Sequence, residues 1–111
     1  MKLIISESKL EPLVFMYLDR QNFIEIKDGN DVYLLNNEKD KYAQVKYEGD
    51  IDWAGITNSL CMEVSRIFSL SEKESEGFIA KWIKKKFNVK GMFVFQRYLK
   101  DDVLILRTPT K

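Results

Sequence analysis

The chain has no histidine and a single cysteine, Cys61, among its 111 residues. Without histidine it has no Ser–His or Cys–His nucleophile pair, no imidazole base and no zinc site with imidazole ligands. A single thiol forms no intrachain disulfide and no Cys-rich zinc site, a pattern that fits a reducing compartment. We therefore expect no cofactor, no metal site and no catalytic residue, and the interpretation that follows is a non-enzymatic protein, although the sequence leaves open whether the protein is an enzyme.

Glycine, proline and long apolar runs are also scarce. Five Gly and two Pro accompany 45% hydrophobic and 32% charged residues, which is typical of a globular domain. The longest apolar run, Leu13–Leu18, is too short to cross a bilayer, and Leu3–Ile5 is too short for a signal-peptide core. We expect one domain over residues 1–111, cytoplasmic rather than secreted, with no membrane partner.

Positive charge is concentrated in the second half of the chain. Residues 1–55 hold seven Lys/Arg and eleven Asp/Glu, a net charge of −4, whereas residues 56–111 hold eleven and six, a net charge of +5. Such an asymmetry indicates a basic surface that could bind a polyanion. The candidate nucleic-acid-binding residues are Lys81, Lys84, Lys85, Lys86, Lys90, Arg97, Lys100 and Arg107.

Apolar spacing and polar turns predict the elements of the first half. A helix is expected after Ser8, whose spacing to Glu11 fits a capping box. Its apolar face includes Leu13, Val14 and Leu18. Alternating segments after it, separated by Asp-, Asn- and Gly-rich turns, predict an antiparallel meander with one solvent-facing side. The expected strands are Lys2–Ser6 before the helix and Phe23–Lys27, Val32–Leu35 and Tyr42–Glu48 after it.

Two amphipathic helices joined by a tight turn are predicted between residues 56 and 91, after a connector at 49–55. The first has Thr57 or Asn58 as its cap, and the second starts with a capping box of Ser71 and Glu74. Strands at Met92–Tyr98 and Val103–Arg107 predict a closing β-hairpin. The predicted apolar faces are Ile56, Leu60, Val64, Ile67 and Phe68, then Phe78, Ile79, Trp82, Ile83 and Phe87.

These elements predict the α+β class, in the order β-α-β-β-β-α-α-β-β. The expected sheet is antiparallel, built from the central meander and the C-terminal hairpin. One face of it packs against the N-terminal helix and the central αα-hairpin.

The segment FSLSEKESEGFIAKWIKKKFNVKG (68–91) and the start MKLIISES (1–8) resemble a pattern found in small uncharacterised proteins of tailed phages, notably marine ones. The resemblance covers about a third of the chain. It implies a viral origin, and hence a site of action in the host cytoplasm. Since those proteins have no established activity, the resemblance implies no mechanism and assigns no site residues.

Three short patterns allow a chemical interpretation beside a structural one. The pairs Asp28/Asp31, Asp50/Asp52 and Asp101/Asp102 could supply Mg²⁺ ligands, but each lies in a predicted turn, where Asp is favoured. Glu25 and Lys27 have the E-x-K spacing of restriction-like nucleases without the upstream Asp of those folds. Cys61 lies beside an apolar face and is expected to be buried and inert.

Three hypotheses for function follow. The first is a viral accessory protein that acts through contact with another, unknown protein. The second is a nucleic-acid-binding protein that uses the basic residues, with Phe93, Phe95 and Tyr98 either stacking on single-stranded bases or packing in the core. The third is a metal-dependent nuclease that uses Glu25, Lys27 and turn carboxylates. The oligomeric state stays open.

Overall fold

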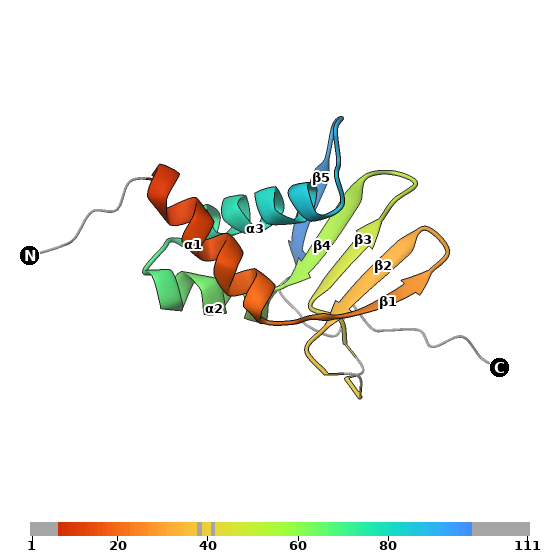
Figure 1. The fold of residues 1–111 in the computed structure, drawn as a ribbon, viewed down its shortest axis with the longest axis horizontal. Coiled ribbons are helices and arrows are strands. Elements are labelled where there is room, and N and C mark those ends of the chain that lie inside the picture. Colours follow the sequence, from red (N-terminus) through yellow and green to blue (C-terminus); the bar gives the residue numbers. More distant parts are fainter. Residues whose placement is uncertain (1–6, 38, 41, 99–111) are drawn as a thin grey trace, which may run out of the picture.

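The described part of the chain consists of three helices and five strands (Figure 1). The computed structural model describes residues 7–37, 39–40 and 42–98. One helix precedes four strands, and two helices precede the last strand, so the predicted α+β class is confirmed. The elements are α1 (Glu7–Arg20), β1 (Ile24–Asp28), β2 (Asp31–Leu35), β3 (Val45–Glu48), β4 (Trp53–Thr57), α2 (Asn58–Phe68), α3 (Glu72–Lys86) and β5 (Val94–Tyr98).

The strands form one sheet in the order β1-β2-β3-β4-β5. The first four are antiparallel neighbours, which confirms the predicted meander, whereas β5 lies parallel to β4. Parallel strands cannot be joined by a tight turn, and here α2 and α3 form the connection from β4 to β5. Figure 1 shows the helices gathered on one side of the molecule and the sheet on the other. The parallel pair was not indicated by the sequence.

Strand β4 corrects two predictions. Residues 49–55 were expected to form a connector, and Ile56 was expected on the apolar face of the next helix. Instead, Ile56 pairs with Val45 of β3, and the helix begins at Asn58. Ile56 precedes Leu60 by four residues, so the spacing of a helix face also fits a strand that runs directly into a helix. Strand β3 is also shorter than the predicted Tyr42–Glu48.

The caps of the two central helices are confirmed. Thr57 is the N-cap of α2 and accepts a hydrogen bond from the backbone N–H of Leu60 at 3.2 Å. Ser71 and Glu74 form both bonds of the predicted capping box, at 3.1 and 3.0 Å. These bonds satisfy amide groups that the first turn of a helix leaves free. Ser69 then ends α2 with a φ of 53°.

Helix α1 begins at Glu7, so Ser8 lies inside the helix and not at its predicted cap. Val14 and Leu18 of its apolar face are fully buried, as expected. Leu13 is 45% exposed, which corrects its assignment to that face. On α2, Ile67 is likewise 47% exposed although the same periodicity placed it in the core.

One hydrophobic core joins the three helices to one face of the sheet. The predicted apolar face of α3 is confirmed, because four of its five side chains are buried and Phe87 packs against them. Phe87 also stacks on Tyr47 of β3, with ring centroids 4.4 Å apart. The buried members are Val14, Leu18, Leu34, Val45, Tyr47, Ala54, Ile56, Leu60, Cys61, Val64, Phe78, Ile79, Trp82, Ile83 and Val89.

The opposite face of the sheet is not the wet face that the sequence predicted. Tyr33 and Leu35 alternate with the core residue Leu34, yet both are buried and form a second cluster with Ala43. The Lys46 ammonium lies 5.4 Å from the centre of the Tyr33 ring. This face therefore combines buried apolar side chains with polar ones.

Two predicted strands, Lys2–Ser6 and Val103–Arg107, lie outside the described residues. The same holds for Asp101 and Asp102 and for the pairing that would close the C-terminal hairpin.

Candidate functional site

The structure divides the predicted basic patch into two places. Four of its lysines lie in the second half of α3, and Lys90 comes just after the helix. All five are exposed. Arg97 lies elsewhere on β5, where its Nη1 is 3.2 Å from Glu72 and 3.9 Å from Glu76. Lys100 and Arg107 lie outside the described residues. We call the set Lys81, Lys84, Lys85, Lys86 and Lys90 the lysine face.

Contacts on both sides fix the position of α3 and hence of the lysine face. The indole N–H of Trp82 donates a hydrogen bond to Asp19 of α1 at 2.9 Å. The Lys86 ammonium lies 3.2 Å from Glu25 of β1 and 5.7 Å from the centre of the Trp82 ring. Helix α3 is thus held between α1 and the sheet, and its outward side presents the lysines.

The lysines differ in how far other residues neutralise them. Lys81 lies 4.0 Å from Glu11, at the limit of an ion pair, and Lys85 lies over the Phe15 ring. Lys84 and Lys90 form no ion pair with any residue among those described. Lys85 has no carboxylate partner among these residues either, so Lys84, Lys85 and Lys90 carry the charges that an anionic ligand could use.

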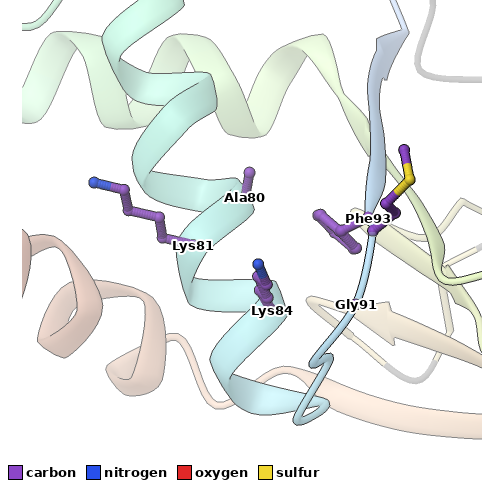
Figure 2. A pocket seen from close by; sticks show the side chains of 6 residues that line it. Ala80, Lys81, Lys84, Gly91 and Phe93 are labelled. Atoms are coloured by element: carbon purple, nitrogen blue, oxygen red, sulfur yellow. The ribbon is translucent and has the colours of Figure 1, made fainter.

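A groove of about 390 Å³ opens between α3 and the segment that leads into β5. Figure 2 shows Ala80 and Lys84 on the side of α3 nearer to Phe93, whereas Lys81 extends to the other side of the helix. Met92 stands at the groove and is 92% exposed. We call this feature the α3–β5 groove; its lining consists of Ala80, Lys81, Lys84, Gly91, Met92 and Phe93.

Of the three aromatic residues proposed to stack on bases, the structure brings one into this groove. Phe93 lines it, and its ring centre lies 6.3 Å from that of Phe95. Phe95 packs against the main core, and Tyr98 packs against the second cluster on the opposite face. The sequence did not identify Ala80, Gly91 or Met92 as part of a site. A feature of the sequence that could have identified them is the short segment 87–92, which separates the last lysine of α3 from Phe93.

Cys61 is buried, as predicted. Burial raises the pKa of its thiol, and the nearby Arg97 guanidinium only partly opposes this effect. Its Sγ lies 3.4 Å from Arg97 Nη1. A thiol that stays protonated and has little access to solvent is a poor nucleophile, so Cys61 is a packing residue.

Asp50 and Asp52 hold the turn in which they lie. Asp50 accepts a hydrogen bond from Asn30 at 2.6 Å, which links the two turns at one end of the sheet, and Asp52 accepts one from Tyr47 at 2.8 Å. Glu25 of the E-x-K pattern pairs with Lys86. Across the described residues, no three Asp, Glu or Cys side chains are placed to hold a metal ion. The structure thus offers nothing that supports the nuclease hypothesis.

No helix within the described ranges is long and apolar enough to span a membrane. Comparison with known proteins finds no matching family model, no similar curated protein and no similar solved structure.

Proposed function

We propose that this protein acts by binding nucleic acid through the lysine face of α3. The observation that carries the proposal is that Lys84 has no acidic partner among the described residues and lines a groove together with Phe93. Lys90, which also has no acidic partner among these residues, directly precedes Gly91 of the groove in the chain. Carboxylates pair with Lys86 and, at longer range, with Lys81, whereas Lys84 on the groove side and Lys85 on the α1 side have no carboxylate partner among the described residues.

Ammonium groups of lysine bind phosphates as point charges and release the counterions that these phosphates had condensed. The affinity should therefore fall steeply with salt and depend little on base sequence, because phosphate contacts carry no sequence information. Lys81 lies about one turn before Lys84 and Lys85 on α3, whereas Lys84, Lys85 and Lys86 are consecutive and point in different directions around the helix. Of the three consecutive lysines, Lys84 is the one that lines the groove beside Phe93.

The test is fluorescence anisotropy with labelled oligonucleotides between 50 and 200 mM salt. Lys84→Glu should weaken binding of a single strand by about eightfold at 50 mM salt. Each phosphate contact contributes about 0.7 to the slope of the logarithm of the affinity against the logarithm of the salt concentration. Between 50 mM and about 1 M, where the contribution of the contact is taken as zero, the salt concentration changes by a factor of about 20, which gives this loss. Lys73→Glu is the matched control, since Lys73 is also exposed but lies in the first turn of α3. Absence of binding at 50 mM, or equal affinities of the two variants, would refute the proposal.

Contact with a partner protein is the second candidate, and a different surface favours it. Large apolar side chains of α1 and α2 are close to half exposed, among them Leu13 and Ile67. Tyr17 of α1 donates a hydrogen bond to Glu63 of α2. On their helices, Leu13 lies one turn before Tyr17, and Ile67 lies one turn after Glu63. These exposed side chains therefore flank one helix–helix contact. Apolar surface of this kind is common in protein interfaces.

A viral origin and action in the host cytoplasm belong to this second candidate, and the resemblance of residues 68–91 to phage proteins supports them. A pull-down from host lysate should then capture a partner that withstands high salt. Ile67→Glu should abolish capture, whereas Lys84→Glu should not. The control is Ile51→Glu, because Ile51 is 62% exposed in the turn between β3 and β4. If no relevant host yields a partner, this candidate fails.

The genes that lie beside this one would help to separate the two candidates, because neighbours for replication, packaging or virion assembly would each indicate a different function.

A further inference from the structure

We infer that the α3–β5 groove accepts an unpaired base, so that the preferred ligand is single-stranded nucleic acid. The inference rests on the proposed nucleic-acid binding and adds the form of nucleic acid that is bound. Its basis is the juxtaposition of an aromatic ring and an unneutralised lysine across one open groove.

The first step is the shape of the groove. Its volume of about 390 Å³ falls in the range of sites that bind small planar ligands. Ala80 on one wall and Gly91 on the other have little or no side chain, and a Cβ added at Gly91 would meet no atom within 4 Å. The space between α3 and Phe93 is therefore open to a flat group.

The second step is that the Phe93 ring is held in place before any ligand arrives. Phe93 is half-buried and packs on the main core, and its ring lies beside that of Phe95. The next residue is tied to the sheet, because the backbone N–H of Val94 donates to the carbonyl oxygen of Asp52 at 3.0 Å. A fixed ring loses little conformational freedom when a base stacks on it.

The third step is the chemistry around the ring. Lys84 lines the same groove as Phe93, and Lys90 directly precedes Gly91 in the chain. A base on the ring would place its phosphates near these ammonium groups. The thioether of Met92, which is almost fully exposed, adds a polarizable group that packs well against aromatic rings. Aromatic rings beside a basic surface are the usual means of binding single strands without sequence preference.

The fourth step is that a double-stranded nucleic acid cannot place a base on the Phe93 ring. In a double helix the faces of the bases are stacked on one another and cannot lie against Phe93. A duplex could contact only the lysines, through its phosphates. Single strands should therefore bind more tightly than duplexes at the same salt concentration, because base stacking contributes only in the single strand.

The test compares three labelled probes on the intact protein: a 15-mer of thymidylate, a 15-base-pair duplex and an abasic 15-mer that keeps the phosphates. Stacking of one base is worth about fivefold to 150-fold in affinity. The affinity for the thymidylate probe should exceed that for the abasic probe by a factor in that range. It should exceed that for the duplex by a smaller factor, because the higher charge density of a duplex strengthens its phosphate contacts. Phe93→Leu should reduce the affinity for the thymidylate probe to that for the abasic probe, with the salt slope unchanged.

Phe68→Leu is the matched control, because Phe68 is also partly buried against the core but lies on α2, where its ring contacts Tyr17. If Phe93→Leu does not fold, as judged by circular dichroism, the comparison of the thymidylate and abasic probes on the unchanged protein still decides the question. Equal affinity for all three probes would overturn this inference and leave the proposed function standing. Absence of binding to any probe at 50 mM salt would overturn both.

Discussion

Replacing Gly55 by alanine should destabilise the protein, because two aromatic rings close over this glycine. Gly55 lies in β4, and the rings of Trp53 and Tyr98 are 6.1 Å apart between centroids at an angle of 60°. A Cβ on Gly55 would lie 2.7 Å from Cη2 of Trp53 and 2.8 Å from Cε2 of Tyr98. Both distances are far shorter than a van der Waals contact, so at least one ring has to move.

The size of the effect follows from two opposing contributions. Overpacking of this kind lowers the free energy of unfolding by about 1–3 kcal/mol. Alanine in a strand returns about 0.5–1 kcal/mol, since glycine loses more backbone freedom on folding. We expect a net loss of about 1–2 kcal/mol, which for a domain of this size lowers Tm by about 4–8 °C.

The assay is thermal and urea denaturation followed by circular dichroism and tryptophan fluorescence. Gly77→Ala is the matched control, because Gly77 lies within α3 and an added Cβ there meets no atom within 4 Å. That change should raise stability by up to about 1 kcal/mol through helix propensity. The reasoning about the rings is wrong if Gly55→Ala is as stable as the wild type while Gly77→Ala behaves as expected.

Two further predictions concern a partly buried carboxyl group and a pair of buried hydroxyls. Burial, followed by the charges of Glu48 and other nearby carboxylates, raises the pKa of Asp31 despite the opposing Lys46. The free energy of unfolding should therefore fall as the pH rises through that pKa, and Asp31→Asn should gain stability at pH 7 but not at pH 3 in urea titrations. The hydroxyls of Ser65 and Ser75 join α2 to α3 at 2.7 Å, so Ser65→Ala should cost about 1–2 kcal/mol. The double alanine variant should lose less than the sum of the single changes in the same titrations; strict additivity would show that the pair is not coupled.

The sequence predicted best those elements whose ends are marked by local chemistry. The capping box of Ser71 and Glu74 and the apolar spacing of α3 depend on residues a few positions apart, so they can be identified without tertiary information. The β1–β2 turn is similar, because Gly29 adopts a φ of 62° between two alternating segments. In each case the local preference and the fold agree.

Strand β4 could not be identified in this way. Gly55 and the acidic turn before it suggest a connector, and Ile56 fits the apolar spacing of the helix that follows. What makes 53–57 a strand is pairing with β3 on one side and β5 on the other, a tertiary effect that propensity does not contain. The parallel pairing of β5 depends on the same missing strand.

The candidate site was predictable in its charge but not in its shape. The lysines of α3 were identified from the distribution of charge along the sequence, which cannot show that Arg97 lies apart from them on β5 and pairs with Glu72. The α3–β5 groove arises only when β5 is placed beside β4, since this brings Phe93 next to α3. The two walls of the groove are close in the chain, but their arrangement depends on a strand pairing that the sequence did not indicate.

The structure also decides which lysines can reveal a function. Lys86 contacts both Glu25 and Trp82, so its replacement alters the contact of α3 with β1 as well as the surface charge. Lys84 and Lys90 form no ion pair with other described residues, so reversing their charge breaks none of the ion pairs within residues 7–37, 39–40 and 42–98. A loss of binding in Lys84→Glu at unchanged Tm would therefore indicate a ligand contact, whereas the same loss in Lys86→Glu would not separate binding from folding. The lysines that the fold does not need are the ones whose removal tests what the protein binds.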